Sequence, residues 1–459
     1  MTTSLPPRGS SQAALPPAGS DAPRFSAPAG EIIGWHDRGA LRATGLCYAT
    51  ARRFCPPVDT PPSRVPVHAT TWSPAAPQNI EPELNAALGV AVEEFHVCEE
   101  ALHLSITLPE HPADTPRPVM VWIHGGSYVF GTADLPVFDT RPLALEGDVI
   151  VVGVNYRLGL LGFLGGEGRP ANLGLLDLIS ALRWIHTNIA AFGGDPGNVT
   201  LFGHSAGGDA AAHLMIAEGA EGLFQRAIIQ SAPLGIRRGR AKMNARMAAV
   251  AAEVTEDTPL DEVLRIQTRV IEAAQGFGLK SAMPFAPQYG HYPLPREQHA
   301  PAAWRRAAAA IDVLIGTTFE ETALFLVLSP ALSRLRRAPW LGQPLTGALV
   351  AATTRKIYRR DAADFARRHA KSDGRAFVYR FDWNQGRGPY GAAHTLELPL
   401  LLGEPQSWRD ADIVKGVEES ELHECGQRLR KLWADFARSG HLAQKGRIEK
   451  VIQWWRANE

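Results

Sequence analysis

Cysteine is scarce in this sequence, and the few cysteines form no recognisable motif. The four residues are Cys47, Cys55, Cys98 and Cys425, with no CxxC pair and no dense framework. This pattern excludes a fold held together by many disulfides and is typical of free thiols in a reducing compartment. A bridge between Cys47 and Cys55 is the alternative. We therefore expect free thiols and a cytoplasmic location.

An excess of either charge is also absent, as is any long apolar run. Lysine plus arginine total 47, and aspartate plus glutamate also total 47. This balance removes the overall positive field that attracts nucleic acid. No run is long enough to span a membrane, and the amino-terminal residues lack the apolar core of a secretory signal. We expect no nucleic-acid partner and no membrane span, and the oligomeric state stays open.

The chain is long enough for one large core, with 459 residues of which 45% are hydrophobic. Proline, serine, glycine and alanine dominate residues 1–30. Such a composition buries too little apolar surface to offset the entropy lost on ordering. We expect a disordered tail over 1–30 and a single domain over 31–459.

Short apolar runs rich in β-branched residues alternate with longer helical patterns beyond the tail. This alternation predicts an α/β fold, with a mostly parallel central sheet and helices on both faces. The helical pattern that takes over at about 234–310 predicts a helical insertion above the carboxyl ends of the strands, where it shapes a pocket. A helical pair without a pocket role is the alternative. The expected strands are 118–124, 149–156, 198–203, 226–230, 311–316 and 376–383, and the expected long helix is 172–193.

The segment NVTLFGHSAGGDAAAHL places Ser205 between Gly203 and Gly207. Its first part favours a strand and its last part a helix. A sharp strand-to-helix turn strains the central residue and leaves no room for side chains on the flanking residues, which explains the glycines. We interpret the turn as a nucleophile elbow that presents the Ser205 hydroxyl, with an idle serine in a glycine-rich turn as the alternative. His204 is expected to point away from the serine, and either to pack or to support the residues that contact the substrate.

A serine nucleophile needs a base and a third group that orients the base. In an elbow fold the acid and then the histidine follow the serine, each on a loop after a later strand. The segment IDVLIGTTFEETALF offers Glu320 and Glu321 after a strand, and AFVYRFDWNQGRGPYGAAH offers His394 after another. The segment PVMVWIHGGSYVFG ends a strand on two glycines, whose backbone N–H groups suit an oxyanion. A simple tight turn is the alternative for these glycines.

These motifs together resemble the type-B carboxylesterase family, the cholinesterase-like branch of the α/β-hydrolases. The resemblance runs from about residue 98 to 440 and is carried by VMVWIHGGSYVFG, VIVVGVNYRLGLLGFL, FGGDPGNVTLFGHSAGG and AAHTLELPLLLG. It implies an α/β-hydrolase fold and ester hydrolysis with neither metal nor cofactor. Matched to the family motifs, the acid is Glu321, with Glu320 where an aspartate is usual, and the base is His394. The implied oxyanion hole consists of Gly125, Gly126, Ser127 and Ala206.

The sequence departs from the family pattern at several positions. His204 stands where the family has a glutamate, and Thr322 stands where a glycine usually follows the acid. Ala101 occupies a usual cysteine position, which implies that a disulfide of secreted members is missing. Compared with the family pattern, the chain is shorter in the segments that build the acyl and alcohol pockets. Substrate preference is therefore the property that the sequence determines least.

We expect a serine carboxylesterase that hydrolyses uncharged, fairly hydrophobic carboxylic esters through an acyl-enzyme on Ser205. The same triad acting on carbamates, amides or lactones is one alternative, and a non-catalytic binding module on the same fold is another. Several apolar side chains are candidates for the rim of the pocket and equally for the core. They are Tyr128, Phe130, Phe285, Tyr289, Leu324 and Phe325.

Overall fold

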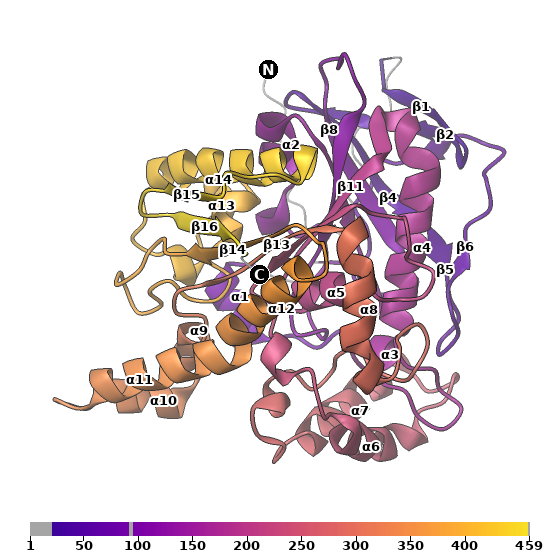
Figure 1. The fold of residues 1–459 in the computed structure, drawn as a ribbon. Helices are drawn as coiled ribbons and strands as arrows, with labels where there is room; N and C mark the ends of the chain where they lie inside the picture. Colours follow the sequence, from indigo (N-terminus) through magenta and orange to yellow (C-terminus); the bar gives the residue numbers. More distant parts are fainter. Residues whose placement is uncertain (1–20, 91–94, 458–459) are drawn as a thin grey trace.

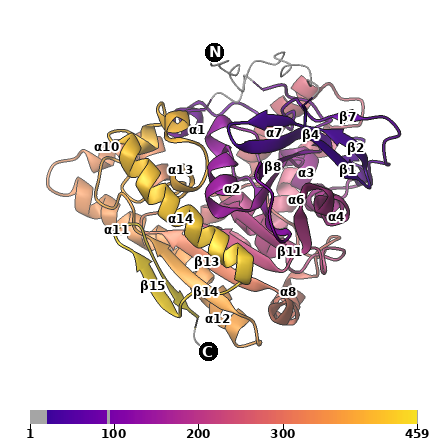
Figure 2. The same cartoon turned by 90° about the horizontal axis from the view of Figure 1, so that it is seen from above.

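A mixed sheet of eleven strands forms the centre of the computed structural model, which describes residues 21–90 and 95–457 (Figures 1 and 2). The strand order is β15-β16-β14-β13-β12-β11-β9-β10-β8-β4-β3. In chain order the strands are β3 (Trp35–Asp37), β4 (Ala40–Cys47), β8 (His103–Pro109), β9 (Arg117–Ile123), β10 (Ile150–Val154), β11 (Gly194–His204), β12 (Arg226–Gln230), β13 (Asp312–Thr318), β14 (Ala376–Phe381), β15 (Lys445–Ile448) and β16 (Ile452–Arg456).

The middle of the sheet is parallel and the two edges are antiparallel. Strands β10, β9, β11, β12, β13 and β14 pair in parallel, each with its neighbour in the sheet. These strands overlap the six predicted ones, because runs of apolar β-branched residues are typical of strands buried on both faces. The edge strands β8, β4 and β3 on one side and β16 and β15 on the other pair antiparallel. No strand was predicted in those edge segments.

Two hydrophobic cores lie on opposite faces of the sheet. Along β9, Val119, Val121 and Ile123 belong to one core, whereas Met120 and Trp122 belong to the other. This alternation follows from the two-residue period of a strand. Helices cover the first core with α3 (Gly159–Phe163), α4 (Leu173–Asn188), α5 (Ala206–Leu214) and α12 (Arg360–Ala370), and the second with α1 (Pro82–Leu88), α2 (Arg141–Gly147), α13 (Leu398–Leu401) and α14 (Glu419–Ser439).

The predicted disordered tail is too long at its carboxyl end. Residues 1–20 lie outside the described part of the chain, but β1 (Arg24–Ala27) pairs antiparallel with β2 (Gly30–Ile33). Phe25 of β1 is buried, and its ring stacks on Phe192 with centroids 4.4 Å apart. One buried aromatic and four paired residues order this stretch despite its composition. Two further small pairings involve β7 (Val67–His68), and β5 (Ala49–Thr50) with β6 (Val58–Asp59).

Two helical segments interrupt the parallel strands. Between β12 and β13 lie α6 (Ala241–Val250), α7 (Leu260–Ala273) and α8 (Ala300–Ala307), within the range where helices were predicted. Between β13 and β14 lie α9 (Ala323–Leu328), α10 (Pro330–Arg336), α11 (Gly342–Thr354) and a π-helical turn before α12. The sequence predicted a helical run after Glu321, but it did not predict a second segment of several helices here. Helices α10 and α11 project from the body of the molecule in both views (Figures 1 and 2).

Two expectations from composition can be compared with the structure. All four cysteines are free, so the predicted thiols are confirmed and the alternative bridge between Cys47 and Cys55 is not formed. Among the described residues, every helix is too short or too polar to cross a membrane.

A buried ion pair fixes the loop after β10 to helix α4. Arg157 donates to Asp177 Oδ2 from its backbone N at 3.0 Å and its Nε at 2.9 Å, and to Oδ1 from Nη2 at 2.6 Å. Asp177 is fully buried and Arg157 nearly so. Since the carboxylate is held by several donors, its removal leaves the guanidinium charge in the interior without a counter-ion.

We therefore predict that Asp177→Ala lowers the free energy of unfolding by about 3–5 kcal/mol, measured by urea denaturation. The matched control is Asp435→Ala, which removes the exposed partner of Lys431 at 2.9 Å. That change is expected to cost less than about 1 kcal/mol, because exposed ion pairs are screened by water. Equal losses in the two variants would contradict a structural role for the buried pair.

Candidate active site

Ser205 occupies the turn between β11 and α5 with a strained backbone. Its φ is 58° and its ψ is −119°, a conformation that residues other than glycine rarely adopt. The turn is held from both sides, because Ser205 N donates to the carbonyl of Gln230 at 2.8 Å and Asp209 N donates to the carbonyl of Ser205 at 2.9 Å. The neighbouring strand β12 and the first turn of α5 therefore fix the position of the serine.

The glycines around the serine are required by close main-chain packing. A Cβ atom on Gly203 would lie 2.4 Å from the carbonyl oxygen of Gly207, and one on Gly207 would lie 2.0 Å from that of Ile123. Both distances are far below van der Waals contact. The geometry thus agrees with the interpretation of the sequence, in which no side chain fits beside the serine.

The loop after β9 lies directly against this turn. A Cβ atom on Gly125 would lie 3.2 Å from the Ser205 Cβ atom, and Gly126 has a φ of 104°. Ser127 follows with a φ of 54°, so the loop turns sharply while it passes the serine. Ala206, on the other side, is fully buried as the first residue of α5. The structure thus brings the four predicted oxyanion-hole residues around Ser205.

His124 stabilises this loop from beneath. Its Nδ1 lies 2.8 Å from the carbonyl oxygen of Gly125, and the Tyr156 hydroxyl donates to the His124 carbonyl at 2.8 Å. Burial lowers the pKa of His124 to about 4, so the ring is neutral at neutral pH and its Nδ1–H donates to Gly125. A neutral ring, hydrogen-bonded through Nδ1, holds the loop without adding a charge near the serine.

Glu321 and His394 meet in the structure although 73 positions separate them in the chain. Nδ1 of His394 lies 2.5 Å from Oε2 of Glu321. Oε1 of the same carboxylate accepts from the backbone N of Thr318 at 2.8 Å, and the backbone N of His394 donates to the Glu321 carbonyl at 3.1 Å. Glu321 is fully buried, so these donors replace the water that a carboxylate otherwise needs.

The neighbouring Glu320 has a different partner. Its Oε2 accepts from the backbone N of Ala392 at 2.9 Å, and its own backbone N donates to the Ala392 carbonyl at 2.8 Å. Glu320 therefore braces the loop that carries His394 rather than the imidazole itself. Of the two candidate acids, Glu321 is the one that contacts the histidine ring.

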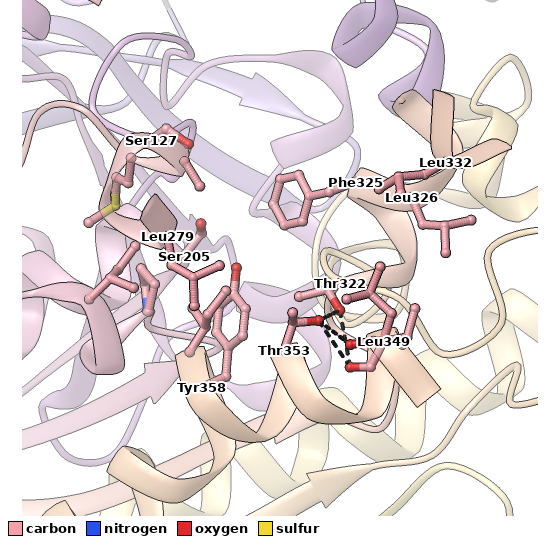
Figure 3. Close-up of a pocket in the computed structure, with 16 residues that line it drawn as sticks. Ser127, Ser205, Leu279, Thr322, Phe325, Leu326, Leu332, Leu349, Thr353 and Tyr358 are labelled. Atoms are coloured by element: carbon pink, nitrogen blue, oxygen red, sulfur yellow. Dashed lines mark hydrogen bonds between the residues drawn. The ribbon is translucent and has the colours of Figure 1, made fainter. Parts of the chain in front are cut away.

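Ser205 lies where two cavities meet. A larger cavity of about 270 Å³ is almost wholly apolar (Figure 3). A smaller one of about 70 Å³ is bordered by Gly125, Gly126, His204 and His394. Both cavities are lined by Ser127, Ser205 and Phe325. Pro233, Ile236, Leu279 and Met283 also line the larger one, and the last three lie within residues 234–310, where the helical insertion was expected.

The apolar rim candidates divide between the cavities and the core. Phe325 lines both cavities, and Phe130 and Leu324 line the smaller one. Tyr128 and Phe285 are buried core residues that line neither cavity, and Tyr289 borders a separate cavity beside Arg240. A place on the pocket rim is therefore wrong for Tyr128, Phe285 and Tyr289. Their apolar or aromatic character did not decide between rim and core, because both environments favour such side chains.

His204 and Glu397 form a buried polar group behind His394. The ring centroids of His204 and His394 are 4.5 Å apart, and Nε2 of His204 lies 3.7 Å from Oε2 of Glu397. Glu397 accepts from the Tyr379 hydroxyl at 2.5 Å and the Ser231 hydroxyl at 3.1 Å. His204 packs as predicted, but the sequence reading missed Glu397. The available signal was an acidic residue among leucines in AAHTLELPLLLG.

Burial shifts the pKa values of Glu397 and His204. It raises the pKa of Glu397 to about 8, with a smaller contribution from the negative charge of Glu321. It lowers the pKa of His204 well below its usual range, and His394 acts in the same direction. Both side chains are therefore mainly uncharged at neutral pH. Within the described residues, no cluster of histidine, cysteine or carboxylate side chains is arranged to hold a metal ion.

Thr322 ties the loop of Glu321 to helix α11. Its hydroxyl oxygen lies 2.7 Å from the hydroxyl oxygen of Thr353, and it donates to the Val350 carbonyl at 3.2 Å (Figure 3). Its backbone N donates to the Thr354 hydroxyl at 3.3 Å. The threonine that replaces the usual glycine therefore anchors this loop to the second helical segment.

The comparisons with known proteins identify the family. The Carboxylesterase family pattern matches residues 41–336. The chain belongs to the carboxylesterase family. This carboxylesterase is 35% identical over 406 residues to the probable N-octanoylanthranilate hydrolase AqdA2 of Rhodococcus erythropolis, covering 87% of this chain and 89% of the relative. It is 32% identical over 456 residues to the para-nitrobenzyl esterase of Bacillus subtilis (strain 168), covering 90% and 89%.

A solved structure of a thermophilic pNB esterase is 29% identical to the carboxylesterase and superposes with a TM-score of 0.76, covering 92% of each chain. The expected α/β-hydrolase fold is therefore confirmed, and the protein is a carboxylic ester hydrolase.

The raised pKa of Glu397 predicts a pH dependence of stability. Between about pH 4.5 and pH 8 the unfolded chain releases this proton while the folded carboxylesterase retains it. The free energy of unfolding therefore falls as pH rises through that window. In Glu397→Gln this contribution is absent, so the stability of the variant relative to the wild type should rise by roughly 4 kcal/mol between about pH 5 and pH 9. Urea denaturation across this range measures the difference, and parallel pH curves for the two proteins would exclude it.

Proposed function

We propose that this carboxylesterase hydrolyses uncharged, fairly hydrophobic carboxylic esters through an acyl-enzyme on Ser205, with His394 as the base and Glu321 as the acid that orients it. The observation that carries the proposal is the 2.5 Å contact between His394 Nδ1 and the buried Glu321 carboxylate, beside a cavity that Ser205 also lines. A carboxylate on Nδ1 leaves Nε2 without a proton, which is the state a general base needs.

The reaction then follows from these positions. His394 takes the proton of Ser205 as the hydroxyl oxygen attacks the ester carbonyl. The negative charge that develops on the carbonyl oxygen is stabilised by backbone N–H groups of the predicted oxyanion hole. The alcohol leaves with the proton from His394. Water then attacks the acyl-enzyme with His394 again as the base, and the carboxylic acid leaves as the Ser205 oxygen regains a proton. The groups proposed for the oxyanion hole are Gly125, Gly126, Ser127 and Ala206.

The two cavities support a substrate with one large and one small group on either side of the ester. A cavity of about 150 Å³ holds a benzene molecule. The larger cavity, at about 270 Å³, therefore suits an aromatic ring or a medium-length chain, whereas the smaller one, at about 70 Å³, suits only a few heavy atoms. The apolar lining of the larger cavity (Figure 3) favours an uncharged substrate.

A substrate with an N-octanoyl group is a second candidate. The relative named as a probable N-octanoylanthranilate hydrolase aligns with 87% of this chain and supports it. Cleavage of an N-acyl bond passes through the same kind of tetrahedral intermediate, so the proposed triad and oxyanion hole serve both reactions. We also propose a cytoplasmic location, supported by the four free thiols.

Covalent labelling tests the nucleophile. Purified wild-type protein should react with a fluorophosphonate probe, because the oxygen of an activated serine displaces fluoride from phosphorus and forms a stable phosphonate ester. Ser205→Ala should not be labelled, while Ser231→Ala, which changes another buried serine in the neighbouring turn, should keep its label. Intact-mass spectrometry measures the adduct. Equal labelling of wild type and Ser205→Ala would refute the assignment.

A pair of conservative variants tests the acid. Glu321→Gln removes the charge that orients His394 and should lower kcat by about 10²–10⁴-fold. Glu320→Gln keeps an acceptor for the Ala392 N–H and should lower kcat by less than about tenfold. Hydrolysis of a p-nitrophenyl ester gives both values, and circular dichroism checks that both variants fold. A larger loss in Glu320→Gln than in Glu321→Gln would reverse the assignment of the acid.

A further inference from the structure

The segment between Glu321 and Asp361 has a composition unlike the rest of the chain. It contains no aspartate or glutamate, although acids and bases balance over the whole sequence. It includes α9, α10, α11 and the π-helical turn, and all of these residues belong to the described part of the chain. Its basic residues are Arg334, Arg336, Arg337, Arg355, Lys356, Arg359 and Arg360.

The tip of this segment exposes large apolar side chains. Trp340, in the turn between α10 and α11, is 95% exposed, and Leu341 beside it is 65% exposed. The hairpin of α10 and α11 projects away from the sheet, so this tip is the part of the segment farthest from the core (Figures 1 and 2). Isolated exposed leucines are common on protein surfaces, but an exposed tryptophan at the end of a projection is not.

The exposed apolar side chains continue from the tip to the active-site cavity. Leu341, Leu345 and Leu349 follow one another at intervals of four residues, which places them on one face of α11. Leu345 is 54% exposed and Leu349 is 41% exposed, and Leu349 also lines the larger cavity beside Ser205 (Figure 3). One apolar stripe thus joins the tip of the hairpin to the entrance of the pocket.

The positive charge around the tip has little internal compensation. Arg334 and Arg337 are exposed and lie within the six residues that precede the tryptophan. Among the described residues, the ion pairs of this segment are confined to Arg360, which lies 3.9 Å from Asp364 at the far end. The tip therefore offers an aromatic ring, leucines and uncompensated guanidinium groups on one surface.

We propose that the hairpin of α10 and α11 docks on an anionic lipid surface. Tryptophan and leucine enter the boundary between headgroups and acyl chains, and arginines bind the lipid phosphates. A second copy of the chain fits this surface less well, because a two-fold contact would bring the same basic hairpins together. Docking in this orientation places the apolar stripe and the cavity entrance toward the membrane.

Co-sedimentation with lipid vesicles tests the apolar part of the surface. The full chain should bind vesicles of phosphatidylcholine containing phosphatidylglycerol, and the double variant W340S/L341S should bind at least about tenfold more weakly. The matched control is V65S/Y292S, which removes side chains that are 69% and 56% exposed elsewhere on the molecule. This control should bind like the wild type.

A second pair of variants tests the charge. R334Q/R337Q should weaken binding to the anionic vesicles by about tenfold or more, because each basic residue near the surface adds to the attraction. R305Q/R306Q, which removes two exposed arginines of α8, should have little effect. Wild-type protein should bind vesicles of phosphatidylcholine alone more weakly than the anionic ones, and added salt should reduce binding to the anionic ones.

Three results would overturn the proposal. They are the absence of binding to anionic vesicles, binding that the W340S/L341S change leaves unaltered, and a dimer in size-exclusion chromatography that this change converts to a monomer without any lipid binding. The last result would assign the surface to a second copy of the chain. All these measurements record binding and not hydrolysis, so their outcome is separate from that of the proposed function.

Discussion

The active site depends on a steric constraint: main-chain atoms of β9, β11 and α5 approach so closely that positions 203 and 207 have no space for a Cβ atom. This approach forces the chain to reverse within a single residue and holds Ser205 in a strained conformation. The strain is maintained because the strands on both sides lie in large buried cores that do not deform locally. The same approach brings the glycine loop after β9 within contact of the serine.

The electrostatic environment of His394 depends on the hydrogen bonds and burial of three neighbouring side chains, which are those of Glu321, Glu397 and His204. Glu321 receives donors from the backbone of Thr318 and from the imidazole, and these replace water around its buried carboxylate. Glu397 lies close to it, and burial together with this nearby charge favours its neutral form. His204, which replaces the glutamate usual for the family, is neutral as well. At neutral pH neither Glu397 nor His204 therefore adds a full charge beside the carboxylate that contacts the imidazole, whereas an ionised glutamate at position 204 would add one.

The parallel centre of the sheet could be predicted from the sequence because local propensity and tertiary burial favour the same structure there. The elbow could be predicted for the same reason, since its glycines answer a local steric need. The choice of Glu321 over Glu320 rested on a motif, because the partners that distinguish the two carboxylates, His394 for Glu321 and the Ala392 N–H for Glu320, are distant in the chain. Glu397 could not be placed, because a buried acid among leucines has the same local pattern as an exposed one.

The segments that sequence analysis missed are those whose order comes from distant contacts. Strand β1 depends on the stacking of Phe25 on Phe192 from another part of the chain. The second helical segment begins with the apolar run ALFLVL, which was expected to be helical, but the projecting helices that follow it were not predicted. The division of the aromatic residues between core and rim likewise depends on which neighbours cover each ring, and composition does not record this.

The contact between Thr322 and Thr353 has a consequence for how this enzyme diversifies. It joins the residue after Glu321 to the carboxyl-terminal half of α11, so the acid-bearing loop and that half-helix form one mechanical unit. Insertions or deletions around residue 340 leave this joint intact and are free to remodel the outer turns. A chimera with a crossover between residues 322 and 353 would take the two threonines from different parents and would disrupt this contact. Both threonines should therefore come from the same parent when this region is exchanged between relatives.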